Sequence, residues 1–257
     1  MPRRRKKNTV WKIILFLLVA AIMIMSYYTL YDWWQEQRAH FVSYPEFGIE
    51  IPTKYSIHGI DVSRYQNVID WPSVKQMSVG QVQISFAFIK ATEGLNDEDE
   101  MFARNWKKAR EAGITRGAYH FFLATKSGKD QAENFIHSVK LMPGDMPPVL
   151  DIEQTYGVPV DLLRDRAKEW LETVQGYYGV PPVIYTNVDF YKQVLKDDFD
   201  SYPLWVAHYL KRDRPRIYRD WSFWQHNESG RVNGILTPVD FNVFSGDSAE
   251  FRKLLVN

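Results

Sequence analysis

Residues 147–153 read PPVLDIE, a short apolar run whose end carries two carboxylates, Asp151 and Glu153. An ionised carboxylate inside an apolar strand is unfavourable unless it is paired, so each acid is expected to have either a partner or a function. Residues i and i+2 of a strand share a face, which predicts that both side chains point the same way. Their Cα atoms are then about 6.5–7 Å apart, at ~3.3 Å per residue.

Similar apolar runs alternate with amphipathic stretches from Ser56 onward, the pattern of repeated βα units. The predicted strands are 57–62, 86–90, 116–121, 148–152, 183–185, 204–207, 222–225 and 239–242. The predicted helices are 72–77, 100–112, 129–139, 160–178 and 190–195. Eight strands, about five helices and no helix of normal length among the last three strands predict an α/β fold. We expect an irregular TIM-like β/α barrel.

In such a barrel the reactive groups lie at the C-terminal ends of the strands. Four carboxylates are expected there, in the segments GIDVS, VLDIE and PVDFN: Asp61, Asp151, Glu153 and Asp240. Asp61 is on the first predicted strand and Asp240 on the last, and these two strands are neighbours in a closed barrel. We therefore expect both acids to join Asp151 and Glu153 in one cluster. Two acids this close repel each other, and the repulsion raises the proton affinity of one of them. A protonated acid beside an ionised one suits glycoside hydrolysis, which needs a proton donor and a negative charge.

Aromatic residues near the strand ends suit a sugar ligand, because ring faces stack on the C–H faces of pyranoses. Tyr185 and Trp205 are expected nearest the rim. For any single aromatic residue, the competing interpretation is that it packs in the core. For the acids, the competing interpretation is that they form salt bridges with Lys or Arg at the barrel rim. The aromatic set comprises Tyr65, Tyr119, Phe121, Tyr156, Tyr185, Trp205, Tyr209, Trp224 and Phe241.

Other chemistries have little support in the sequence. The absence of cysteine excludes disulfides, thiolate zinc sites and a cysteine nucleophile. None of the six histidines forms an i, i+4 pair with a glutamate, so we expect no metal site. There is no glycine-rich phosphate loop after a strand and no G-x-S-x-G motif, and we expect no cofactor.

The N-terminal region differs from the rest in charge and hydropathy. Residues 1–31 hold six basic groups and no acid, which leaves 26 basic and 31 acidic residues, a net of −5, for 32–257. That remainder is a poor surface for nucleic acid. Residues 13–25 are all apolar, and weakly polar residues extend the run to Tyr31. A helix over this run is about 28 Å long, close to the thickness of the hydrocarbon layer.

We therefore predict four parts: a basic cytoplasmic tail (1–9), a transmembrane signal-anchor (10–31), a juxtamembrane spacer (32–56) and the barrel (57–257). The basic cluster Arg3–Lys7 should stay cytoplasmic, which sends the barrel across the membrane to the periplasm or cell surface. The alternative is a cleaved signal peptide. Ala20 and Ala21 lie inside the apolar run and bulky aromatics follow Ser26, which argues against cleavage.

Eight motifs in this order give the chain a family resemblance: GIDVSRYQNVIDW, FAFIKATEG, FARNWKKAREAGITRGAYHFF, PPVLDIE, VIYTN, PLWVAHY, WSFWQH and PVDFNVF. From about Ile57 to Phe244 the sequence resembles the glycoside hydrolase family 25 lysozymes, the Chalaropsis-type muramidases. The resemblance implies an irregular β/α barrel with five helices. It also implies hydrolysis of the β-1,4 bond between N-acetylmuramic acid and N-acetylglucosamine in peptidoglycan.

The same resemblance assigns roles to individual positions. Glu153 corresponds to the general acid/base and Asp151 to the carboxylate that assists at the reaction centre, while Asp61 and Asp240 match the remaining acids. The motifs that line the saccharide groove contain Tyr119, Tyr185, Trp205 and Gln225. The family is associated with retention, through attack by the substrate's 2-acetamido oxygen or directly by Asp151.

Two alternatives remain at this point. The chain is a catalytically silent glycan-binding module, or it hydrolyses a chitin-like polymer of N-acetylglucosamine. A pure binder has no need for four clustered acids, which argues against the first. The partners we expect are peptidoglycan glycan strands and, through the N-terminal helix, the membrane. We expect a monomer that binds no nucleic acid.

Overall fold

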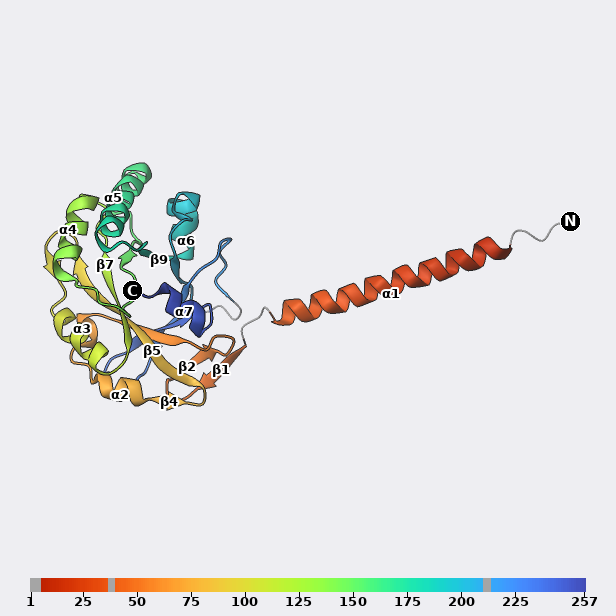
Figure 1. Ribbon diagram of the computed structural model, residues 1–257, viewed down its shortest axis with the longest axis horizontal. Coiled ribbons are helices and arrows are strands. Elements are labelled where there is room, and N and C mark those ends of the chain that lie inside the picture. The colour runs from red at the N-terminus through yellow and green to blue at the C-terminus, as the bar shows by residue number, and fades with distance from the viewer. Residues whose placement is uncertain (1–5, 37–39, 210–213) are drawn as a thin grey trace.

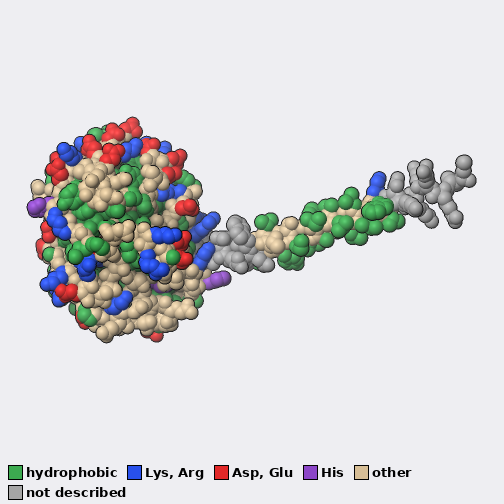
Figure 2. Space-filling view, in the orientation of Figure 1, with side chains coloured by type: hydrophobic (Ala, Val, Ile, Leu, Met, Phe, Trp, Pro, Cys, Tyr) green, Lys and Arg blue, Asp and Glu red, His purple; other side chains and the backbone are tan. Residues whose placement is uncertain are grey.

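The computed structural model describes residues 6–36, 40–209 and 214–257, as a long N-terminal helix and a barrel (Figure 1). Helix α1 spans Lys6–Glu36. Its stretch Val10–Tyr31, 22 residues with no buried part, is long and apolar enough to cross a membrane. Figure 2 shows hydrophobic side chains along this helix, whereas the barrel surface carries mixed charges. The expected basic tail falls mainly on residues 1–5, outside the described residues.

Eight strands form the predicted closed barrel. They follow the order β3-β12-β11-β10-β9-β8-β7-β5, and the pairing of β5 with β3 closes the ring. Their bounds are β3 His58–Val62, β5 Val82–Glu93, β7 Thr115–Phe121, β8 Val149–Asp151, β9 Val183–Asn187, β10 Leu204–Ala207, β11 Phe223–Gly230 and β12 Val239–Phe244. Two short strands, β4 (Ser78–Val79) and β6 (Asp97–Glu98), pair with the ends of β5.

The helices cover the first two thirds of the barrel from outside (Figure 1). Their bounds are α2 Trp71–Gln76, α3 Phe102–Glu111, α4 Gly128–Ser138, α5 Val160–Tyr178, and α6 Val188–Phe190, which continues as η2 Tyr191–Leu195 and η3 Lys196–Phe199. A further helix, α7 (Ser248–Leu254), was not predicted. Its signal is a capping box, since the Asp247 carboxylate accepts from the Ala249 and Glu250 amides, while Glu250 accepts from the Asp247 amide.

Strand β12 runs opposite to the other barrel strands. It pairs antiparallel with both β11 and β3, although we expected every site residue at the C-terminal end of its strand. Residues 231–238, which connect β11 to β12, are fewer than the dozen or so that a parallel crossover requires. Asp240 therefore reaches the barrel mouth from the beginning of its strand.

Aromatic side chains fill the barrel interior below the mouth. Phe88 stacks on Trp205 with ring centroids 4.2 Å apart, and Phe86 packs on Phe223 at 5.3 Å. A Cβ on Gly59 would lie 2.4 Å from the Phe86 ring, so glycine is needed for this packing. Phe251 of α7 contacts Phe86 and Phe223, and α7 thereby closes the bottom of the barrel.

Part of the predicted spacer 32–56 is instead a folded hairpin. Strands β1 (Phe41–Tyr44) and β2 (Ile49–Pro52) pair antiparallel, and Phe47 and Ile51 are fully buried. The ring of Phe47 lies 5.4 Å from the ring of Phe241, and the backbone carbonyl of Phe47 accepts from the Arg231 amide at 2.8 Å. The hairpin thus packs against β12 and the β11–β12 connection, where the barrel has no helix. Four-residue strands carry too short a pattern for the sequence alone to reveal this packing.

The hairpin should contribute to the stability of the barrel. We expect Ile51→Ala to lower the free energy of unfolding by roughly 2–4 kcal/mol, because it leaves a cavity in the shared core. Urea denaturation followed by tryptophan fluorescence measures the change. Val42→Ala is the matched control, since Val42 lies in the same hairpin with an exposed side chain. Equal losses in the two variants would mean that the hairpin does not share the core.

Candidate active site

A cavity of about 260 Å³ opens at the barrel mouth, and of the aromatic set expected near the strand ends Tyr156, Tyr209, Trp224 and Phe241 are not among its lining residues. The cavity is lined by the four predicted acids and by the four residues that the family resemblance assigned to the saccharide groove. These residues come from seven of the eight barrel strands, or from directly after them. They are Asp61, Tyr119, Asp151, Glu153, Tyr185, Trp205, Gln225 and Asp240. The cavity is further lined by Val62, Ser63, Tyr65, Gln66, Lys90 and Phe121.

Strand register brings the acids together. Asp61 lies directly opposite Asp240 in the β3–β12 pair, as expected for the first and last strands. Asp151 ends β8, and Glu153 follows two residues later, outside the regular strand. The Ile152 amide donates to the Tyr185 carbonyl at 3.0 Å, which continues the ladder past Asp151. Both acids of the D-x-E segment consequently face the same cavity.

Asp61 and Asp240 lie opposite each other, and their surroundings favour one proton between the two carboxyl groups. One carboxylate oxygen of Asp61 accepts from the Gln225 amide at 2.8 Å and from the Asn242 amide at 2.7 Å. Burial raises the pKa of Asp61, but these two bonds favour its ionised form. Burial, with the charge of Asp61, raises the pKa of Asp240 to about 9. The proton of the pair therefore resides on Asp240.

This proton gives the protein a predictable pH dependence. The pKa of Asp240 is about 9 in the folded chain, whereas its ordinary value is 3.8. At any pH between these two values, folding is therefore accompanied by uptake of a proton. The contribution of this proton to stability is then fully present below pH 3.8 and is lost as the pH rises through about 9. Asp240→Asn needs no proton and can still donate to Asp61. We expect the variant to melt at a higher temperature than wild type, with a difference that grows from about pH 5 to pH 8.

Thermal unfolding at the two pH values tests this prediction. Asp165→Asn is the matched control, because Asp165 is exposed on α5 and has the same chemistry. An equal difference for Asp240→Asn at both pH values would contradict the assignment of the proton.

Asp151 and Glu153 also have raised proton affinities. Burial raises the pKa of Asp151 well above its usual range; the charge of Glu153 raises it further, and Lys90 partly opposes the rise. Burial, then the charge of Asp61, raises the pKa of Glu153. One carboxylate oxygen of Asp151 is buried without a hydrogen-bond partner. Within the described residues none of the four acids pairs with a basic side chain, so the salt-bridge interpretation does not hold for them.

Two residues predicted to line the saccharide groove, Trp205 and Gln225, line the cavity and also belong to the polar network around Asp61. Trp205 and Gln225 are each only 2% exposed. The Trp205 indole donates to Asn242 at 2.8 Å, and the Gln225 carbonyl accepts from Tyr185 and Tyr209 at 2.7 and 2.6 Å. These contacts align the amides that hydrogen-bond to Asp61. Trp205 lies deeper than expected because it stacks on Phe88 within the barrel.

Local sequence patterns also relate three further residues around the cavity to the site. Asn242 follows Asp240 by two positions in a strand and therefore shares its face. Ser63 and Gln66 form a capping box after β3, in which the Ser63 amide donates to Gln66 at 2.9 Å. Gln66 then donates to the Pro238 carbonyl at 3.1 Å. The loop after β3 is thereby fixed to the β11–β12 connection at the rim.

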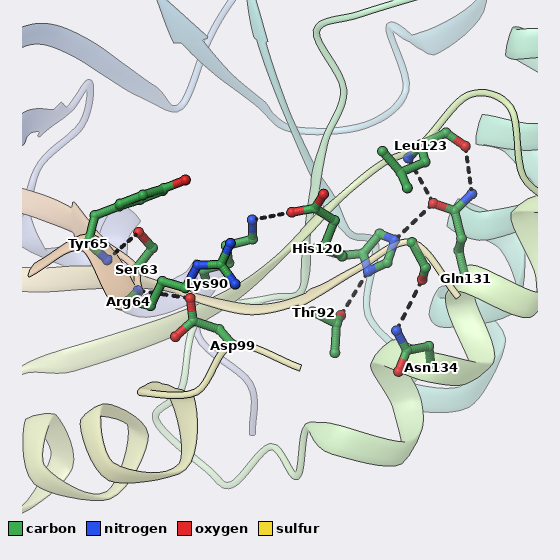
Figure 3. A network of polar contacts seen from close by, with 12 residues as sticks. Ser63, Arg64, Tyr65, Lys90, Thr92, Asp99, His120, Leu123, Gln131 and Asn134 are labelled. Atoms are coloured by element: carbon green, nitrogen blue, oxygen red, sulfur yellow. Dashed lines mark hydrogen bonds and ion pairs between the residues drawn. The ribbon is translucent and has the colours of Figure 1, made fainter. Parts of the chain in front are cut away.

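A second polar network supports the mouth from outside the cavity (Figure 3). The His120 ring contacts Thr92 at 2.8 Å and Gln131 at 3.3 Å, and Gln131 accepts from the Leu123 amide at 2.8 Å. Burial lowers the pKa of His120 to about 3, so the ring is neutral. The network joins β5, the loop after β7 and α4, and its role is to hold these elements together.

Comparisons with known proteins agree on one family. The sequence model of Glycosyl hydrolases family 25 matches residues 60–235. YegX of Escherichia coli is 45% identical over 216 residues, which cover 83% of this chain and 79% of YegX. Lysozyme M1 of Streptomyces globisporus is 35% identical over 216 residues, which cover 78% of this chain and 72% of the lysozyme. The structure of a family 25 glycosyl hydrolase from Bacillus anthracis matches with a TM-score of 0.73 and 30% identity, over 82% of this chain and 99% of that one.

Proposed function

The chain belongs to glycosyl hydrolases family 25 and is a glycoside hydrolase of lysozyme type, and we propose that it cleaves one particular bond of peptidoglycan. That bond is the β-1,4 linkage between N-acetylmuramic acid and N-acetylglucosamine. The observation that carries this proposal is the convergence of four acids in one cavity, with Asp151 and Glu153 adjacent and no basic partner among the described residues. One proton donor and one negative charge are what this hydrolysis needs.

Glu153 is the proposed general acid/base. It is the half-buried member of the D-x-E pair, whereas Asp151 is buried. A raised pKa keeps a proton on Glu153 for the glycosidic oxygen, which leaves as an alcohol when its bond to C1 breaks. In the second step the ionised Glu153 takes a proton from water while the water oxygen bonds to C1. Glu153 is thereby returned to its acid form.

Asp151 is proposed to assist the reaction without forming a covalent bond. Burial and the neighbouring Glu153 raise its pKa, which opposes the charged form that a nucleophile needs. The 2-acetamido oxygen of the substrate instead bonds to C1, and Asp151 orients this group from the cavity wall. Water then attacks C1 and the bond between C1 and the acetamido oxygen breaks, which restores the acetamido group and leaves the configuration at C1 retained. Undiminished hydrolysis of an analogue with a hydroxyl in place of the acetamido group would contradict this route.

Product analysis tests the bond that is cleaved. The full chain in detergent is incubated with peptidoglycan, the products are reduced with borohydride, and mass spectrometry identifies the reduced sugar. Reduced N-acetylmuramic acid supports the proposal, and reduced N-acetylglucosamine contradicts it. Faster cleavage of chitin oligomers would support a chitin-like substrate, and binding without cleavage of either polymer would establish a silent binding module.

We also propose that Val10–Tyr31 anchors the enzyme in a membrane with the barrel on the extracytoplasmic side. The length and composition of α1 support the anchor, and the basic residues at its start support the orientation. The barrel hairpin begins at Phe41, so the active site acts on cell wall close to the membrane. Fractionation and protease treatment of spheroplasts test both points, because the barrel should stay with the membrane and be digested from outside.

A further inference from the structure

Lys90 is a cavity residue that the proposed reaction leaves without a role. It follows Phe86 and Phe88 on the inward face of β5, and its side chain is only 14% exposed. Among the described residues that line the cavity it is the only basic one, against four acids. A buried ammonium in the wall of such a site is costly unless it has a partner or a function.

The surroundings of Lys90 hold its charge at the mouth. Its ammonium donates to the Glu93 carboxylate at 2.6 Å and lies 4.9 Å from the centre of the Phe121 ring. Glu93 and Asp151 both lie opposite Phe121 in the strand register, so the ammonium reaches the level of the D-x-E pair. It forms no ion pair with any of the four acids in the described structure. An ammonium has three donors, and the bond to Glu93 uses only one.

A peptidoglycan strand is anionic, in contrast to chitin. Each muramic acid carries a lactyl carboxyl group, which is either free or extended by a peptide with carboxylates of its own. The ionised carboxylate of Asp61, held in this confined, low-dielectric cavity, repels such a substituent, whereas the fixed ammonium of Lys90 attracts it. Charge-assisted hydrogen bonds to a carboxylate are also stronger than neutral ones.

We propose that Lys90 binds a carboxylate of the substrate next to the scissile bond, and that Glu93 positions Lys90 for it. The inference rests on the proposed muramidase function and adds the residue that selects anionic glycans over neutral ones. The competing role is a counter-charge for Asp151 alone, which would act equally on every substrate.

The test uses binding, so that turnover is not required. The full chain with Glu153→Gln, in detergent, is titrated calorimetrically with two probes. One is a tetrasaccharide of alternating N-acetylglucosamine and N-acetylmuramic acid with free carboxylates, and the other is its methyl ester. We expect the acid to bind about 10- to 100-fold more tightly than the ester, the range of a charged hydrogen bond. Adding Lys90→Met should abolish this preference, and adding Glu93→Gln should weaken it without abolishing it, since the cation remains but loses the carboxylate that positions it.

Two results would overturn the inference. The first is equal binding of acid and ester before Lys90 is changed. The second is an equal loss of affinity for both probes in the Lys90→Met protein, which indicates the counter-charge role. Failure of the muramidase proposal is recognised separately, because wild type would then release no reduced N-acetylmuramic acid from peptidoglycan.

Discussion

Glu153→Gln should lower kcat on peptidoglycan by at least about 10²–10⁴-fold, the typical contribution of general acid catalysis. Glutamine keeps the size of the side chain and its hydrogen bonding but cannot transfer the proton to the glycosidic oxygen. We expect the wild-type rate to decline at high pH as Glu153 loses this proton, at a pH above the usual carboxylate range because burial raises the pKa of Glu153. Residual activity of the variant should lack that decline. Zymograms and reducing-end assays across pH measure both effects.

The control for this variant is Glu228→Gln. Glu228 lies on β11 with an exposed side chain, and the substitution removes the same charge. Its rate should change by less than about threefold, since an exposed charge is screened by water and salt. Normal activity of Glu153→Gln would remove the general-acid assignment, although the family membership would stand.

Arg116→Met should be the most destabilising single substitution that we predict, at about 3–5 kcal/mol. Arg116 on β7 and Asp145 in the segment before β8 have side chains that are only 4% and 3% exposed. The guanidinium donates to both carboxylate oxygens, at 2.8 and 3.0 Å, and lies over the Trp106 ring. Without Arg116, the charge of Asp145 is left buried and without its main partner. Urea denaturation measures the loss.

A double variant separates the charge from packing. In Arg116→Met with Asp145→Leu no charge is left buried, so it should recover part of the stability lost in the single variant. The pair lies outside the cavity, and activity per folded molecule should be unchanged in both proteins. A double variant that is less stable than the single one would contradict the electrostatic explanation.

The sequence by itself predicted the eight barrel strands, the main helices and the four acids that meet at the mouth. Strand alternation relates Asp151 to Glu153, and in PVDFN it relates Asp240 to Asn242, because both relations depend only on residues two positions apart. The alternation of apolar runs with amphipathic helices likewise predicted the barrel, since each period is local.

Only the tertiary structure decided the contacts between distant segments. The reversed direction of β12 places Asp240 opposite Asp61, and amides from two other positions, Gln225 and Asn242, assign the shared proton. The hairpin at residues 41–52 is stabilised by packing against Phe241, far along the chain. Strand pairing likewise determines that Lys90 lies beside the acids. Proton affinity and burial depend on neighbours in space, which no local period encodes.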